Sequence, residues 1–292
     1  MELRIRKRIG VRIVEAATII KYVRSLSGIT RKELAALAGV SPSTVGRIER
    51  GELDPTWGTL SRILEATGYQ INGNTVVSAG DPTAIIAARK LLESSVNATA
   101  SQNQCKASGA NELAERWVQR WRRAGWLTPK VSGSSSERGA SNGKRSPERL
   151  IILAVNAGNA SKLTRRKVVR RTVVAPNGWQ NLVKQIGAAG FDYAVSGMAA
   201  AREDRSVVST TDPVVYVDNP AEVAACLSLE EALPGRGVLL ISASGDELVE
   251  TEDYGGIRYV SRLQGILDAF AGPGREPDKA EDELRSLLAV NS

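Results

Sequence analysis

The side chains that most often carry catalytic or metal chemistry are scarce in this chain. Its 292 residues include no histidine, which excludes histidine general bases, Ser-His triads and histidine-bound metals. The two cysteines, Cys105 and Cys226, are too far apart for a Cys-x-x-Cys metal site, and we interpret both as free thiols in a reducing cytosol. No segment has the apolar length of a signal peptide or approaches the ~18 residues of a membrane helix. We therefore expect a soluble cytoplasmic protein with no metal and no cofactor.

Acidic side chains offer one arrangement that could bind a metal ion. Asp212 and Asp218 flank the apolar segment PVVYV and fall on the same face of a strand. Nucleotidyl transfer requires two carboxylates that share Mg²⁺, but six residues of extended chain place these two roughly 20 Å apart. The preceding segment, VSGMAAAR, resembles the Gly-rich turn of the nucleotidyltransferase fold. Because closely paired acids are missing, we expect that the protein is not an enzyme.

Charge is divided unevenly along the chain. Residues 1–78 contain 12 Lys and Arg against 7 Asp and Glu, a balance of +5. Residues 79–175 contain 18 against 6, a balance of +12, and residues 176–292 contain 9 against 19, a balance of −10. Basic surfaces favour the phosphate backbone of nucleic acids through counterion release. The change of sign indicates that the two ends of the chain have different partners.

The segment TRKELAALAGVSPSTVGRIERGELDP carries the start and stop signals of two short helices. Thr30 and Glu33 have the spacing of a capping box. Gly39 gives the backbone the freedom for a sharp turn. Ser41 can cap the next helix, and Pro42 occupies its first position, where the missing N–H costs nothing. The segment therefore predicts two helices joined by a tight turn.

Flanking patterns complete a four-helix arrangement. Apolar residues at helical spacing predict one helix over residues 14–25 and another that runs from Pro55 to Gly68. This arrangement is a helix-turn-helix, and residues 14–70 resemble the Cro/C1-type family, also called the XRE family. The resemblance is carried by the run Leu-Ala, Gly-Val-Ser, Thr-Val and Ile-Glu-Arg-Gly. It implies binding to double-stranded DNA.

The resemblance also implies roles for individual residues. In this family the third helix lies in the major groove, with its N-terminal residues on base edges. The base-contacting positions fall on Ser43, Thr44 and Arg47. Ser41 would cap the helix and touch phosphate. Family members often have Gln at the positions that Arg31 and Pro42 occupy here. Pro42 cannot form the two hydrogen bonds to adenine that Gln forms. Arg31, at the start of the second helix, suits a phosphate better than a base. Arg47 is therefore expected to be the main reader, with guanine as its base.

Residues 79–175 are expected to form a basic middle segment. Two amphipathic helices are predicted, over residues 84–95 and 111–124, and residues 132–148 have the composition of a flexible loop. The segments RLIILAVNAG and RKVVRRTVVAP then resemble strands, so the whole could form a winged helix.

Aromatic and basic residues alternate in the second of these helices. Trp117 and Trp121 share one face and are predicted to lie in the core. Arg116, Arg120 and Arg123 lie near another face, where they either contact DNA or form a solvated surface. The excess of positive charge favours the first interpretation, and we predict that all three bind DNA.

Residues 176–292 are expected to form an acidic domain in which strands alternate with helices. FDYAVSG, DPVVYVD, GRGVLLISA and GIRYVS are predicted strands, and PAEVAACLSLEEAL is a predicted helix. GPGRE lacks the spacing and the lysine of a P-loop, so it predicts a turn between helices. The whole chain is thus predicted to be α+β, with an N-terminal all-α helix-turn-helix domain over residues 1–78 and a C-terminal mixed α/β domain over residues 176–292.

The acidic domain resembles the C-terminal domain of AbiEi-type antitoxins over residues 177–288. The matching positions are Trp179, Tyr193 with Gly197, Tyr216 to Asp218, Gly237 to Leu240, Leu267-Asp268 and Gly274-Arg275. These antitoxins are transcriptional regulators of type IV toxin–antitoxin systems, whose toxin is a nucleotidyltransferase. Members usually begin with a winged helix, whereas here a Cro/C1-type domain comes first, so the layout of the DNA-binding surface is left open.

Three functions are compatible with these patterns. The first is a sequence-specific repressor that acts as the antitoxin of a type IV pair and represses its own operon, with a nucleotidyltransferase toxin as partner. The second is a stand-alone transcription factor whose C-terminal domain senses a ligand. The third, a DNA-tethered nucleotidyltransferase, is disfavoured because the paired acids are missing. The sequence favours the first.

Overall fold

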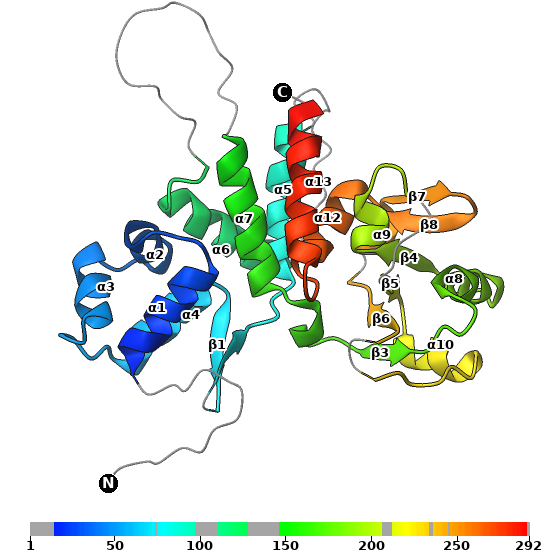
Figure 1. The fold of residues 1–292 in the computed structure, drawn as a ribbon, viewed down its shortest axis with the longest axis horizontal. Helices are drawn as coiled ribbons and strands as arrows, with labels where there is room; N and C mark the ends of the chain where they lie inside the picture. The colour runs from blue at the N-terminus through cyan, green and yellow to red at the C-terminus, as the bar shows by residue number, and fades with distance from the viewer. Residues whose placement is uncertain are drawn as a thin grey trace, which may run out of the picture. The chain divides into compact units, whose positions relative to one another are not determined.

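The computed structural model describes residues 15–73, 75–96, 110–127, 146–205, 212–233, 236–244 and 246–290. The chain divides into two compact units, residues 1–166 and residues 167–292 (Figure 1). Within the described ranges the first unit is helical apart from one hairpin, and the second combines a six-stranded sheet with helices. The predicted α+β class is confirmed. No helix in these ranges is long and apolar enough to cross a membrane.

Four helices open the first unit: α1 Ala16–Leu26, α2 Arg31–Ala38, α3 Pro42–Glu49 and α4 Trp57–Ala66. The predicted signals set their ends. The side chain of Thr30 accepts the N–H of Glu33, and the carboxylate of Glu33 accepts the N–H of Thr30, so the capping box is present. Gly39 ends α2 with φ +64°, a conformation that glycine adopts without strain.

The core of these helices consists of the apolar residues that recur at helical spacing. The fully buried members are Ile20, Val23, Leu34, Val45, Ile48 and Ile63. Each buried aliphatic side chain contributes about 1.5–3 kcal/mol relative to an exposed one. This core fixes α3 against α1 and α2 and leaves the opposite side of α3 exposed.

A short hairpin follows, which the sequence did not indicate. Its strands are β1 Tyr69–Asn72 and β2 Thr75–Ser78, antiparallel to each other. The predicted first domain is therefore not all α. After the hairpin come the remaining helices of the unit: α5 Thr83–Val96, α6 Ala110–Arg123, α7 Pro147–Ala160 and the 3-10 turn Leu163–Arg165.

The tryptophans of α6 lie in the core, as predicted. Trp117 and Trp121 are 2% and 0% exposed, and their ring centroids are 5.7 Å apart. The indole N–H of Trp117 donates to Asp81, and that of Trp121 donates to Asn156 of α7, each over 2.9 Å. Both aromatic side chains therefore join α6 to its neighbours by burial and by a hydrogen bond.

The winged-helix expectation is wrong in the described residues. RLIILAVNAG lies in helix α7, and the strand that follows, β3 Arg170–Val173, belongs to the sheet of the second unit. Pro147 stands at the N-terminal position of α7, and Leu150, Ile151, Leu153 and Ala154 are all buried. A helix buried on several sides shows an uninterrupted apolar run, which resembles a buried strand. Most of the predicted loop 132–148 lies outside the described residues.

The second unit is built on a sheet with the strand order β3-β6-β5-β4-β8-β7. The strands after β3 are β4 Tyr193–Ser196, β5 Val214–Val217, β6 Val238–Ser242, β7 Thr251–Tyr254 and β8 Ile257–Val260. The helices are α8 Trp179–Ala188, α9 Met198–Ala201, α10 Pro220–Cys226, α11 Asp246–Val249, α12 Arg262–Phe270 and α13 Glu276–Val290. All residues of β4 and β5 are buried, as expected of central strands covered on both faces.

Most predicted elements of this unit are present, and two details differ. The strand β7 was missed because its sequence, TEDY, is polar and mostly exposed. The predicted helix PAEVAACLSLEEAL ends at Cys226. Ser228 has φ +50°, which breaks the helix, and Glu231 then forms a β-bridge with Val173. Cys226 is an exposed free thiol, while Cys105 lies outside the described residues.

The two structural units differ from the predicted domain boundaries. Residue 78 lies inside the first unit, where the hydroxyl of Ser78 donates to the backbone carbonyl of Asn159 over 2.6 Å. The second unit begins at Lys167 rather than at residue 176, because β3 pairs with β6. Counted over these units, residues 1–166 contain 27 Lys and Arg against 13 Asp and Glu, a balance of +14, and residues 167–292 contain 12 against 19, a balance of −7.

Candidate nucleic-acid interface

The exposed side of α3 carries the predicted base-contacting residues. Ser43 and Arg47 are exposed and Thr44 is half-buried, while Val45, Ile48 and Glu49 face the interior. This division follows from the 3.6-residue period of the helix. The three predicted readers therefore lie together on the surface of one helix that is held by its buried side.

Ser41 has the capping role that the sequence predicted. Its hydroxyl accepts the backbone N–H of Thr44 over 3.0 Å and shares a hydrogen bond of 2.7 Å with the hydroxyl of Thr44. Thr44 is thus partly committed to the cap. Its hydroxyl keeps acceptor capacity for a nucleic-acid donor, because a hydroxyl can donate one hydrogen bond and accept two.

Arg31, predicted to contact phosphate, has an intramolecular partner. Its guanidinium group is bound to the carboxylate of Glu49 over 2.7 Å, and Arg24 binds the same carboxylate over 2.7 Å. The Arg31 side chain is still 47% exposed, so phosphate can reach it. The ion pairs connect α1, α2 and α3 through one side chain that is only 2% exposed.

The carboxylate of Glu49 is held in its charged form. Burial alone raises the pKa of Glu49, but the hydrogen bonds and positive charges of Arg24 and Arg31 outweigh that effect, and the pKa lies below its ordinary value. Sequence reasoning missed both Glu49 and Arg24. For Glu49 the signal was a charged residue on the apolar side of α3, two positions before Gly51.

Arg47 is the exposed cation of α3 that is available for a ligand. The neighbouring Arg50 forms a two-point ion pair with Glu52, with distances of 2.5 and 2.9 Å. Arg47 forms no ion pair with any residue that the structure describes. A guanidinium group in this state can donate two parallel hydrogen bonds to guanine without first losing a partner.

The three arginines of α6 do not share one environment. Arg116 is exposed. Arg120 donates to the carbonyl of Glu65 near the C-terminus of α4 over 3.1 Å and lies over the Trp117 ring at 4.7 Å. Burial lowers the pKa of Arg120 from its ordinary value. Arg123 donates to the carbonyl of Leu37 near the C-terminus of α2 over 3.3 Å.

These contacts give Arg120 and Arg123 a structural role. The last carbonyls of a helix have no partner within it and carry partial negative charge, so a cation there is favourable. Trp126 adds a third link, because its indole N–H donates to Glu33 over 3.1 Å. The middle segment is therefore fastened to the helix-turn-helix. Arg116 and Arg123 are exposed and Arg120 is half-buried, so phosphate can reach the first two more easily.

Glu33 shows the same balance of forces as Glu49. Burial raises its pKa, while the hydrogen bonds from Thr30 and Trp126 and the charge of Arg149 lower it, and the resulting pKa is below the ordinary value. The capping-box carboxylate of α2 is thus also the acceptor for the tryptophan that follows α6.

Helices α2 and α3, each capped at its start and joined by the turn at Gly39, form a helix-turn-helix. With Ser43, Thr44 and Arg47 on the outer side of α3, this is a motif that binds double-stranded DNA. Comparison with protein families supports this class: residues 20–73 match the family described as "Helix-turn-helix". The match supports the predicted Cro/C1-type unit at the N-terminus. Neither the curated proteins nor the solved structures give a match. The protein is accordingly a DNA-binding transcription regulator.

The second unit contains a buried polar cluster. Asp268 is fully buried, and one of its carboxylate oxygens accepts hydrogen bonds from Ser196, Tyr216 and Gln264, over 2.7 to 2.9 Å. Asp212 instead accepts the backbone N–H of Gly237 over 2.9 Å. In the described part of the chain, no group of three or more Cys, Asp and Glu residues is arranged to hold a metal ion.

Proposed function

We propose that the protein is a repressor that binds an operator through α3 and that it regulates its own operon as the antitoxin of a type IV toxin–antitoxin pair. The observation that carries the DNA-binding part is the exposed Arg47, unpaired among the described residues, beside Ser43 on a helix that is fixed by its buried face. The balance of +14 in the first unit supports binding to phosphate.

The antitoxin part is supported by the second unit. Tyr216 and Asp268, two of the positions that resemble AbiEi-type antitoxins, hydrogen-bond to each other in the core beside Ser196. These two positions of the pattern therefore share one buried hydrogen-bond cluster. A balance of −7 suits a protein partner with a basic surface, such as a nucleotidyltransferase that binds nucleic acid.

Footprinting tests the proposal directly. The purified full-length protein, added to the promoter region of its own gene, should protect a discrete sequence at a concentration where unrelated DNA stays unprotected. Co-expression with a nucleotidyltransferase encoded beside it should then restore growth that the enzyme alone prevents. If the protein protects the promoter but does not restore growth, it is a transcription regulator and the antitoxin part of the proposal is wrong.

A second candidate, a stand-alone regulator with a ligand-sensing domain, is favoured by one observation. The second unit contains a pocket with a volume of about 450 Å³, which falls within the size range of small-molecule sites. Rescue of growth by co-expression distinguishes this candidate from the antitoxin.

A further inference from the structure

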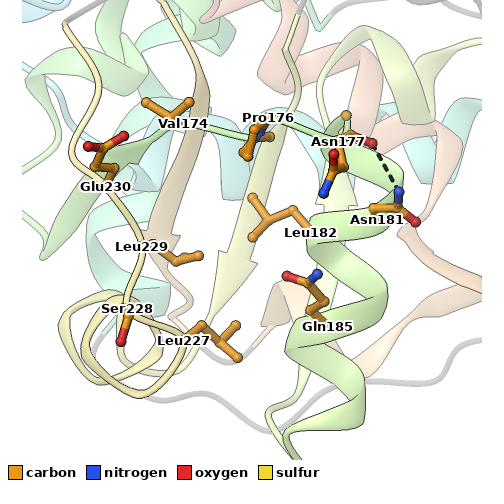
Figure 2. Close-up of a pocket in the computed structure, with 12 residues that line it drawn as sticks. Val174, Pro176, Asn177, Asn181, Leu182, Gln185, Leu227, Ser228, Leu229 and Glu230 are labelled. Carbon is orange, nitrogen blue, oxygen red and sulfur yellow. Dashed lines mark hydrogen bonds between the residues drawn. The ribbon is translucent and has the colours of Figure 1, made fainter.

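The pocket of the second unit lies between α8 and the segment that follows α10 (Figure 2). One wall comes from the chain between β3 and α8 and from the first turns of α8. The other wall comes from residues 227–230. The residues that line it are 174–178, 181, 182, 185 and 227–230.

Both walls are held by backbone contacts within the unit. The N–H of Leu229 donates to the carbonyl of Ala224 over 2.9 Å, and the N–H of Val174 donates to the carbonyl of Glu230 over 2.9 Å. On the opposite wall, the side-chain amide of Asn181 donates to the carbonyl of Asn177 over 3.0 Å. The pocket is therefore preformed and does not require a ligand to shape it.

The lining combines aliphatic and carboxamide side chains. Leu182 and Gln185 extend from α8 toward Leu227 and Leu229 (Figure 2). The structure records no hydrogen bond between the side-chain amide of Gln185, or that of Asn177, and any described residue. Two amides thus face the pocket with donors and acceptors available, and aliphatic surface lies between them.

Charge limits the ligands that this pocket can hold. No Lys or Arg occurs among the lining residues, and Glu230 is the charged residue among them. A phosphate or carboxylate would therefore enter without a cation to balance it and would be repelled by Glu230. The chemistry of the lining selects an uncharged ligand.

Spacing limits the ligand further. Asn177 lies in the turn before α8, and Gln185 lies six positions into that helix, which corresponds to about 9 Å of helix. A ligand that reaches both amides is therefore on the order of 10 Å long, polar at each end and flat or apolar between. A carboxamide pairs well with the edge of a nucleobase through adjacent donor and acceptor groups, and aliphatic side chains suit the faces of a ring.

We propose that this pocket binds an uncharged nucleoside. The base lies against Leu182, Leu227 and Leu229 with its edge on one carboxamide, and the ribose hydroxyls reach the other carboxamide. The proposal is independent of the DNA-binding function, because all of its residues belong to the second unit.

Calorimetric titration of the full-length protein with adenosine, guanosine, cytidine and uridine tests this. At least one should bind saturably with Kd between about 10 μM and about 1 mM. The double variant Asn177→Ala/Gln185→Ala should weaken that binding by at least about tenfold, because two hydrogen bonds are lost. Lys184→Ala, an exposed residue of α8 outside the lining, should leave it unchanged.

Two further comparisons make the outcome decisive. The corresponding nucleoside 5′-monophosphate should bind more weakly than the nucleoside, since the lining offers no cation. Operator binding and the thermal unfolding midpoint should be equal in wild type and double variant, which excludes misfolding. Absence of binding by all four nucleosides at roughly 5 mM, an unchanged Kd in the double variant, or tighter binding of the monophosphate would overturn the proposal.

Discussion

The ion pairs at Glu49 give the most direct quantitative test of how α3 is held. In Glu49→Gln the side chain keeps its shape but loses the charge that Arg24 and Arg31 share. Hydrogen bonds to a charged group contribute about 1.5–3 kcal/mol, and breaking a fully buried ion pair costs about 3–5 kcal/mol. Arg24 and Arg31 are 31% and 47% exposed, so water partly replaces the lost partner. We therefore expect the free energy of unfolding to fall by about 2 kcal/mol.

Urea unfolding followed by tryptophan fluorescence measures this change. Four of the five tryptophans, Trp57, Trp117, Trp121 and Trp126, belong to the first unit, so the signal reports mainly on that unit. Glu52→Gln is the matched control, because Glu52 and its partner Arg50 are 50% and 54% exposed. Water and salt screen an exposed pair, so it contributes much less to stability than a buried one. If the two variants lose equal stability, the buried ion pairs do not hold α3 as we argue.

Four further predictions follow from the same structure. Arg47→Ala should weaken specific operator binding by about 1–3 kcal/mol while leaving nonspecific binding nearly unchanged; an unaltered footprint and affinity would contradict its role as reader. Arg116→Ala should lower the slope of log K against log salt concentration by about one, the value of one phosphate contact. Arg123→Ala should chiefly lower the thermal midpoint, because Arg123 donates to the carbonyl of Leu37 in α2. Equal effects of the two substitutions on the salt slope would refute this difference. Folding lowers the pKa of Glu33 and Glu49, so their ionised forms stabilise the first unit at pH values above the unfolded pKa of 4.5. This stabilisation is lost as the pH falls through the lower folded pKa. Urea midpoints measured between about pH 6 and about pH 3 should therefore fall less steeply in Glu49→Gln than in wild type. Residues 167–292 expressed alone should fold, fail to bind the operator and incorporate no labelled nucleotide with Mg²⁺ or Mn²⁺; metal-dependent incorporation would reverse our view that the unit is not an enzyme.

The helix-turn-helix could be predicted closely because its signals are local. Thr30 and Glu33 are three residues apart, and Ser41 with Pro42 marks the start of α3 without reference to the rest of the chain. Capping depends on side chains that reach the nearest backbone groups. The ends of α2 and α3 therefore follow from short segments of sequence.

The parts that could not be predicted depend on distant partners. Arg120 and Arg123 have the spacing of a surface stripe, yet their partners are carbonyls 55 and 86 residues earlier in the chain. In α7 the apolar run is compatible with either a strand or a helix, and packing against α5 selects the helix. Glu49 lies on the apolar side of α3 in the sequence pattern, but its cationic partners, Arg24 and Arg31, come from α1 and α2, and the pattern of α3 does not reveal them.

The links from α6 to the ends of α2 and α4 have a consequence for how such regulators can diversify. One way to change the operator specificity of a regulator is to replace its DNA-reading segment as one block of sequence, or cassette. A cassette that ended at residue 78 would lack three side chains that bind the helix-turn-helix. The carbonyls of Leu37 and Glu65 would lose Arg123 and Arg120, and the carboxylate of Glu33 would lose the indole N–H of Trp126. To change the operator that this protein recognises, one therefore has to transfer α6 and Trp126 together with the helix-turn-helix, or to alter residues of α3 by point substitution.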